Sequence, residues 1–511
     1  MSAKPASVVL PAGSGHAQAV ARAAQHALAL SLALGFVLRV LAANSRSLQY
    51  NDTFSIFLAA RSLPEILSGT AADTMPPLYY FLLHFWMSIS QQVWFIRLLT
   101  TLLSLLVIAI NYALVAHLFG RPAAGWAALL TAISPLQMYH AQDVRMYALL
   151  LVGQSGYLLF FARLYFVRSG QSAQRRDWLG LVLCGTLAMY SHNLAIFALV
   201  VPSLYLLLKW DWKALLRLAL AQMCIGLLAF PWLVLISGQI AKVQKAWSLP
   251  VPGMIEVLQA IVLFTASLPL PFLLLALVTV LSLQIFVMLS LETGRVCRTE
   301  PDVLYLVCAL LLPPTLLFVA SYIMRPIFIP PGFLIASLAY YALAGVVIHR
   351  AWARGVGPVI LGAFVLAAAL SLPSFYTYAD FPRSPYQSAM DALRVTLPPG
   401  GVLVHENKLS YFPAHFYAPE LNQVFVSDAP GSPNDTFEPA SQRAMQIFPQ
   451  PDLSAAADGY QDVYFVVFQQ TLEEYRAAGY AGHPDLAWLA EHFTLVYQQV
   501  FNDLEIYHYH R

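Results

Sequence analysis

The chain has 511 residues, of which 59% are hydrophobic and only 11% are charged, with a formal net charge of +2. A mean hydropathy of +0.64 is far above what a soluble globular domain needs. The small net charge gives no indication of a nucleic-acid partner. No glycine-rich phosphate loop and no zinc-type spacing is present, and the four cysteines all precede residue 378. These properties indicate an integral membrane protein.

Apolar runs of about 20 residues, each long enough to cross a bilayer core of roughly 30 Å, recur from residue 22 to residue 373. The first run is longer than the apolar core of a cleaved signal, so we interpret it as a retained anchor. A shorter run, 76–90, begins with Pro76-Pro77 and is expected to lie in the membrane interface without crossing. The eleven predicted spans are 22–43, 95–119, 122–138, 144–167, 177–191, 193–209, 214–237, 267–291, 302–324, 327–348 and 355–373.

The distribution of basic residues predicts the orientation of these spans. If 76–90 does not cross, the basic clusters around Arg121, 163–176, 209–217, 295–298 and 350–354 all fall on one side. The positive-inside rule makes that side cytoplasmic. The prediction is therefore a cytoplasmic segment 1–21, a transmembrane domain 22–374 with outer-face loops 44–94 and 238–266, and an extracytoplasmic domain 378–511. A prokaryotic plasma membrane is the expected location.

The C-terminal region changes composition after Pro373. Strand-like runs alternate with helical patterns, which favours a small soluble α/β domain. The segment 428–458, rich in Pro, Ser, Asp and Ala, is expected to be a long loop. The predicted strands are 401–405, 423–427, 462–468, 493–501 and 504–510, and the predicted helices are 386–396, 408–417, 471–479 and 484–492.

Asp52 is the first candidate for chemistry, because it follows the first span directly. Transfer of a sugar from a lipid phosphate to a hydroxyl group needs a base, and a carboxylate in a partly dry pocket can be one. The alternative is structural: Asp52 can cap a helix that starts near Thr53.

The second candidate is the segment from Tyr139 to Tyr147 between two adjacent spans. Asp143 and Arg145 are costly at this depth and need partners. Arg145 is expected to bind a phosphate, with Tyr147 as a further donor contact. Asp143 is a second acid, an orienting group or a metal ligand, and a divalent metal shared by Asp52 and Asp143 is one option. The alternative is a local pair between Asp143 and Arg145.

Other outer-face cations and polar groups are expected to contact the donor or its phosphate. Each has an ordinary alternative: an arginine anchored beside Trp94, an interfacial histidine satisfied by backbone, or contact with lipid headgroups. These candidates are Arg97, His192, Lys242, Lys245 and Arg325.

Four stretches in order resemble the GT-C class of integral membrane glycosyltransferases, near glycosyltransferase family 39, which contains protein O-mannosyltransferases and lipid A aminoarabinose transferases. The resemblance covers residues 20–210. The stretches are Asp52 after the first span, Pro76-Pro77-Leu78-Tyr79-Tyr80, Ile96-Arg97-Leu98, and Gln142-Asp143-Val144-Arg145-Met146-Tyr147.

The resemblance implies an outer-facing cavity, a polyprenyl-phosphate sugar donor, Asp52 as catalytic base, and an interfacial helix at 76–90 bearing Tyr79 and Tyr80. The expected function is inverting transfer of a sugar to a glycolipid, an envelope glycan or a protein. Many relatives carry an Arg-Tyr pair after the late Pro-Ile-Phe-x-Pro stretch, where this chain has Pro331-Gly332-Phe333. That difference removes one expected cation and leaves Arg325 as a substitute.

Two other functions fit part of the pattern. A transporter or flippase for a polyprenyl-linked glycan would need polar residues along a path through the bilayer, whereas here they gather at the outer ends of the spans. A binding protein that kept the fold and lost the chemistry would also tolerate the change at Pro331.

Overall fold

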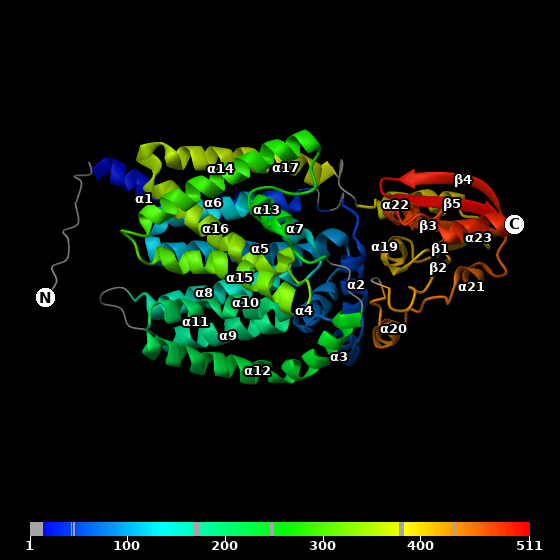
Figure 1. Ribbon diagram of the computed structural model, residues 1–511, viewed down its shortest axis with the longest axis horizontal. Coiled ribbons are helices and arrows are strands. Elements are labelled where there is room, and N and C mark those ends of the chain that lie inside the picture. The colour runs from blue at the N-terminus through cyan, green and yellow to red at the C-terminus, as the bar shows by residue number, and fades with distance from the viewer. Residues whose placement is uncertain are drawn as a thin grey trace.

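The computed structural model describes residues 14–41, 43, 46–167, 174–245, 250–377, 383–432 and 435–511, with the backbone alone for residues 14–25 and 236–245. It consists of a long helical bundle with a small sheet domain at one end (Figure 1). Helix α1 starts at the opposite end of the bundle. The predicted segment 1–21 and the predicted boundary at 378 lie largely outside these residues.

The bundle contains helix in each of the eleven predicted spans. Seven of the described helices are long and apolar enough to cross a membrane. The chain is therefore a polytopic helical membrane protein, as predicted. The helices are α1 (Ser14–Val40), α5 (Val93–Phe119), α6 (Arg121–Ile133), α8 (Tyr147–Tyr165), α9 (Arg175–Ser191), α10 and α11 (Ile196–Leu199 and Val201–Leu208), α12 (Trp212–Lys245), α14 (Phe272–Val296), α15 (Val303–Ile323), α16 (Pro330–Arg350) and α17 (Val356–Thr377).

The third predicted span is interrupted, which the apolar pattern did not indicate. Helix α6 ends at Ile133, and a second helix, α7 (Pro135–Gln142), starts after Ser134. Proline at the first helical position and the Ser134 hydroxyl, which accepts a hydrogen bond from the Gln137 backbone N–H at 3.3 Å, define the new start. The fully buried Arg39 donates to the Ala132 carbonyl at 2.9 Å, so it satisfies the carbonyl end of α6.

Close packing around α16 holds the bundle together. A Cβ atom on Gly345 would lie 2.6 Å from the Ala127 backbone nitrogen of α6, so only glycine permits this approach. The peripheral helices α12 and α14 instead expose large apolar side chains, as expected for surfaces that face lipid. The clearest are Leu216, Leu220, Leu227, Val280, Val287 and Leu291.

The segments predicted as outer loops are largely helical. The first contains α2 (Tyr50–Ala59), α3 (Leu63–Ala72) and α4 (Leu78–Met87), and the second contains α13 (Met254–Leu263). Helices α2, α3 and α4 lie at the end of the bundle that carries the sheet domain (Figure 1). With 10 residues, α4 extends only about 15 Å and is too short to cross a bilayer, as predicted for 76–90.

The C-terminal domain is a five-stranded sheet in the order β2-β1-β3-β5-β4, with β1 parallel to β2 and β3. Strand β5 pairs antiparallel with β3, and β4 pairs antiparallel with β5 to form a hairpin whose turn residue Asn502 has a φ of 53°. The strands are β1 (Val402–His405), β2 (Gln423–Phe425), β3 (Asp462–Phe468), β4 (Thr494–Phe501) and β5 (Leu504–His510). The α/β prediction is confirmed.

Helices cover both faces of this sheet. They are α18 (Tyr386–Thr396), α19 (Lys408–Tyr417), α22 (Gln469–Ala477) and α23 (Pro484–His492). The prediction of a long loop at 428–458 is wrong in part, because this segment contains the short helices α20 (Pro439–Met445) and α21 (Leu453–Ala457). Proline at N1 of α20 and the Asp452 cap of α21 start these turns in a segment too polar to show helical periodicity.

The sheet domain packs directly on α2 and α3. The Phe412 ring of α19 contacts Tyr50, Phe54 and Phe57 of α2, with ring centroids 5.3 to 6.1 Å apart. The Leu48 backbone N–H donates to the Tyr417 hydroxyl at 2.9 Å. The domain therefore rests on the same short helix that carries Asp52.

Candidate active site

A polar cavity of about 730 Å³ lies between the ends of the bundle helices nearest the sheet domain and the connection to that domain. Two acids, two arginines, a histidine and two tyrosines contribute to its wall, among apolar residues from α13, the loop before α14 and the start of α16. The lining residues are Gln49, Asn51, Asp52, Pro135, Leu136, Tyr139, His140, Asp143, Arg145, Tyr147, Gln259, Leu263, Ser267, Leu268, Pro269, Pro330, Pro331 and Arg383.

Asp52 both caps a helix and lines this cavity. It is the third residue of α2, and its Oδ2 accepts a hydrogen bond from the Gln49 backbone N–H at 3.0 Å. Its Oδ1 accepts from the Val144 backbone N–H at 2.8 Å, which ties α2 to the segment between α7 and α8. The carboxylate is 3% exposed. The structural alternative is thus present, at the third position of the helix and not at the N-cap, together with a place on the cavity wall.

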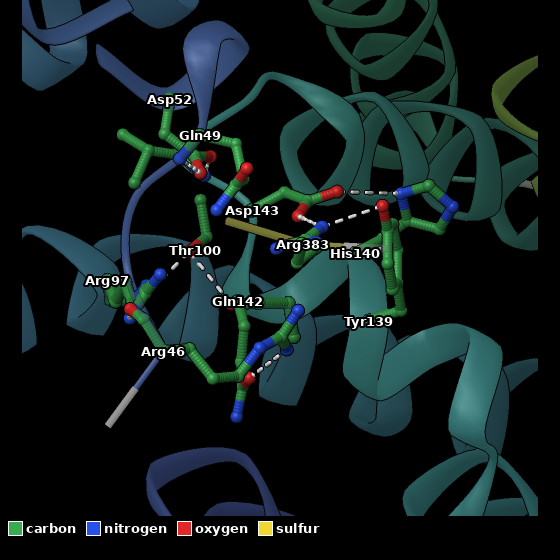
Figure 2. Close-up of polar contacts among 12 residues, drawn as sticks. Arg46, Gln49, Asp52, Arg97, Thr100, Tyr139, His140, Gln142, Asp143 and Arg383 are labelled. Carbon is green, nitrogen blue, oxygen red and sulfur yellow. Dashed lines mark hydrogen bonds and ion pairs between the residues drawn. The ribbon is translucent and has the colours of Figure 1, made fainter. Parts of the chain in front are cut away.

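Asp143 is held by groups from elsewhere in the chain (Figure 2). Arg383 Nη2 lies 3.4 Å from Asp143 Oδ1 and donates a hydrogen bond to the Tyr139 hydroxyl at 2.7 Å. His140 Nδ1 lies 3.6 Å from Asp143 Oδ2. Burial, the largest single influence, raises the pKa of Asp143, but His140, Arg383 and Arg46 together outweigh it, so the net shift is downward. Asp143 therefore stays ionised.

Arg145 is the unusual group in this cavity. It is 7% exposed, and its Nε has no hydrogen-bond partner. Among the described residues no carboxylate lies within ion-pair distance of it, so the alternative of a local pair with Asp143 is wrong. The charge of Asp73 acts on this guanidinium and the Tyr147 side chain hydrogen-bonds with it, but its Nε–H stays open to an anionic ligand.

A second, apolar cavity of about 620 Å³ adjoins the first. Residues of α9 to α12 and of the loop before α16 line it, and His192 and Arg325 contribute its charged or titratable side chains. Tyr147 of the polar cavity lies against His192, with ring centroids 6.1 Å apart. Burial, together with the charge of Arg145, lowers the pKa of His192 to about 3. Arg145, Tyr147 and His192 thus mark the junction of the two cavities.

The remaining residues that the sequence predicts for the site do not line the polar cavity in the part of the chain that the structure describes. Arg97 is buried behind the cavity wall and donates to the backbone carbonyls of Ala43 and Arg46, the latter at 2.7 Å, so the structure does not bring it to the cavity. Pro76, Pro77, Tyr79 and Tyr80 are buried at the start of α4, against the core around α2 and not among the cavity-lining residues. The side chains of Lys242 and Lys245 lie outside the described residues.

The two acids do not present a cage for a metal ion. Both Asp52 oxygens accept backbone N–H groups, and the Asp143 oxygens face Arg383 and His140. Within the described part of the chain, no group of three or more His, Cys, Asp or Glu residues has metal-binding geometry. These donors therefore do not fit the shared divalent metal considered from the sequence, and no chemistry is assigned to one.

Sequence reasoning missed Arg383 and the contribution of His140 and Gln49. Arg383 follows the last span by several residues and belongs to a stretch that looks like a linker, so no local pattern distinguishes it. His140 is three residues before Asp143 on a helical pattern, which places both on one face, and that spacing was the available signal. Gln49 acts through its backbone, which carries no sequence signature.

Comparison with known proteins identifies the fold class of this chain. Residues 74–238 match the family model described as dolichyl-phosphate-mannose-protein mannosyltransferase. No curated protein matches the chain by sequence. Among solved structures, apo ArnT from Cupriavidus metallidurans is 17% identical, with 95% of this chain and 98% of that chain covered and a TM-score of 0.64. ArnT bound to undecaprenyl phosphate is 16% identical, covering 94% and 97%, with a TM-score of 0.63.

A third similar structure is an oligosaccharyltransferase from Archaeoglobus fulgidus in complex with zinc and sulfate. It is 15% identical, with 95% of this chain and 73% of that chain covered and a TM-score of 0.52. These likenesses define the fold: the chain is a polytopic membrane protein with the GT-C fold and a C-terminal sheet domain. The resemblance recognised from the four sequence stretches is confirmed at this level.

Proposed function

We propose that this protein is a membrane glycosyltransferase that moves a sugar from a polyprenyl-phosphate donor to an extracytoplasmic acceptor, with inversion at the sugar. The observation that carries the proposal is Arg145, a buried arginine without a carboxylate partner among the described residues, at the junction of a polar and an apolar cavity. A polyprenyl phosphate has the matching chemistry, because it joins an apolar chain to one anionic group. The ArnT structure bound to undecaprenyl phosphate supports the same ligand class.

The two cavities suggest how the donor lies. Its isoprenoid chain enters the apolar cavity between α9, α12 and the loop before α16, which opens toward lipid-facing helices. Its phosphate meets Arg145 through charge-assisted hydrogen bonds. The sugar then occupies the polar cavity, where Asp52 and Asp143 line the wall.

Asp52 is proposed as the base. Its carboxylate takes the proton of the acceptor hydroxyl as that oxygen attacks the anomeric carbon from the face opposite the phosphate. The bond between the anomeric carbon and the phosphate oxygen breaks, and the polyprenyl phosphate leaves with the electron pair. Arg145 stabilises the charge that develops on this leaving group. One displacement of this kind inverts the anomeric centre.

Of the three roles that the sequence leaves open for Asp143, we propose that of an orienting group. Its lowered pKa makes it a weak proton acceptor, because Arg383 and His140 favour its ionised form against the effect of burial. It holds Arg383 and Tyr139 in place on the cavity wall.

The acceptor side is proposed to be extracytoplasmic, in a prokaryotic plasma membrane with the N-terminus inside. The basic residues support this orientation, because Arg295 and Arg350 lie in the last turns of α14 and α16, whereas the first residues of α16 line the cavity at its other end. The acceptor is a glycolipid, an envelope glycan or a protein.

The test compares envelope glycans and glycolipids from cells that lack the gene, complemented with wild type, Arg145→Gln or Arg145→Lys. We expect one sugar addition to disappear in the deletion, to return with wild type, and to return only weakly with Arg145→Gln. Membrane levels of each variant provide the control. No change in any envelope glycan on deletion, or full complementation by Arg145→Gln, would contradict the proposal.

A further inference from the structure

Arg383 is the one arginine that the connection to the sheet domain contributes to the polar cavity, within the residues that the structure describes there. Its side chain is 10% exposed. It reaches Asp143 at 3.4 Å and the Tyr139 hydroxyl at 2.7 Å, and its guanidinium carbon lies 5.0 Å from the centre of the Tyr139 ring. In Figure 2 it points between Asp143 and Tyr139.

The segment that carries Arg383 is hydrogen-bonded to residues 47–49, which also hold Asp52. Gln49, whose backbone N–H holds Asp52, donates through its side chain to the Ser384 carbonyl at 3.1 Å. The Gln387 backbone N–H donates to the Ser47 hydroxyl at 3.2 Å. On the other side, the Asn502 side chain donates to the Arg383 carbonyl at 2.9 Å and joins the segment to the β4–β5 turn. The sheet domain therefore fixes the position of Arg383.

The charges around the cavity show what Arg383 does. The lining acids are Asp52 and Asp143, and the lining cations are Arg145 and Arg383. Arg46 also lies near Asp143, but it points to Gln142 and to the Phe375 ring, whose centre is 4.2 Å from its guanidinium carbon. Without Arg383, the ionised Asp143 would face an incoming anionic donor with only His140 at 3.6 Å and the weaker, more distant charge of Arg46 to offset it.

We infer that Arg383 is a positioning residue, supplied by the sheet-domain connection, that neutralises Asp143 so that the cavity accepts an anionic lipid-linked donor. The inference rests on the proposed function for the identity of the donor. It gives the sheet domain a definite part in the site: the membrane-embedded cavity lacks its charge balance unless residues 383–387 are in place.

The experiment measures steady-state transfer from a polyprenyl-phosphate sugar by the purified full-length protein. We expect Arg383→Gln to raise the KM for the donor about tenfold, the effect of one unit charge at about 10 Å in a partly desolvated site, with kcat changed less than threefold. Arg383→Lys should restore most of the loss, because it restores the charge. The matched control is Arg394→Gln, an arginine of α18 that pairs with Asp391 and Glu420 away from the cavity.

The deciding variant is the double change Asp143→Asn with Arg383→Gln. If Arg383 acts by neutralising Asp143, this variant recovers a donor KM within about threefold of wild type. A KM for Arg383→Gln equal to that of wild type, or a double variant no better than Arg383→Gln alone, overturns the inference. A purely structural role predicts instead a lower unfolding temperature with no rescue by the second change.

A binding assay distinguishes failure of the proposed function from failure of the charge inference. The same variants are tested for binding of undecaprenyl phosphate alone, in detergent, without any transfer. If wild type transfers no sugar but binds this lipid, with affinity reduced in Arg383→Gln and recovered in the double variant, the transferase proposal fails and the charge inference stands. If binding is unaffected by Arg383→Gln, the charge inference fails.

Discussion

The change Asp52→Asn tests whether the carboxylate acts in catalysis as well as in folding. The structure gives the carboxylate two structural hydrogen bonds besides its place in the cavity. Oδ2 accepts from the Gln49 backbone N–H and Oδ1 from the Val144 backbone N–H. An amide retains one acceptor, and its NH2 group then faces a backbone donor. Loss of one charge-assisted bond in a buried site costs about 1.5–3 kcal/mol. From a folding free energy of about 5–15 kcal/mol, that leaves the protein almost wholly folded.

Loss of a general base lowers the rate by about 10²–10⁴-fold. We therefore expect Asp52→Asn to unfold at a lower temperature and, separately, to lose at least 100-fold in kcat per folded molecule. The assay is single-turnover transfer from a polyprenyl-phosphate sugar, normalised to the folded fraction measured by thermal unfolding in detergent.

The matched control is Glu65→Gln, which replaces the acid in the Ser62–Glu65 capping box of α3, outside the cavity, with the same change from carboxylate to amide. It is expected to cost some stability and to keep full activity. The reasoning is refuted if Asp52→Asn keeps kcat within tenfold of wild type, or if the two variants lose activity in proportion to their loss of stability.

Three further changes test the packing and the charges. Arg145→Met removes the buried cation at the junction of the two cavities, so we expect a loss of undecaprenyl phosphate binding of at least tenfold; binding like that of wild type would contradict the role given to Arg145. Gly345→Leu forces a side chain into the backbone of α6 and should cost at least about 3 kcal/mol, seen as loss of folded protein after extraction, whereas Gly362→Leu, with open space at its Cβ position, should not. Burial and Arg145 lower the pKa of His192 to about 3, so below pH 6.5 the unfolded chain binds a proton that the folded protein does not; stability should fall from pH 6.5 toward pH 3, and the fall should be smaller in His192→Gln.

Much of the fold follows from patterns that are local in the chain. The apolar runs locate the bundle helices, and alternation with turn signals locates all five strands, including the hairpin turn at Asn502. The interruption at Ser134 was missed because Ala, Leu and Ile continue the apolar run up to it. Ser134 and Pro135 mark the start of α7 locally, but the end of α6 is capped by Arg39, about 95 residues earlier in the chain.

The candidate site was partly predictable for the same reason. Asp52, Asp143, Arg145 and Tyr147 were identified because each lies at or just past an end of a predicted span, and the structure places all four on one cavity. Arg97 has the same kind of position, but its guanidinium turns to backbone carbonyls, and the direction of a side chain is not encoded in its spacing.

The break between α6 and α7 also determines how deep the polar cavity lies. Helix α6 has 13 residues and rises only about 20 Å before Pro135 and Leu136 reach the cavity wall, against a hydrocarbon thickness of about 30 Å. In the proposed orientation, with Arg121 at the cytoplasmic edge of the lipid tails, the chamber would lie roughly 10 Å below their outer edge. Under the proposed function, a lipid-linked sugar would reach it by lateral diffusion within the leaflet, whereas an acceptor from the aqueous side would have to insert its hydroxyl group on a narrow, extended segment. Lipid-anchored saccharides and extended chain segments have that shape, and the surface of a rigid folded protein does not.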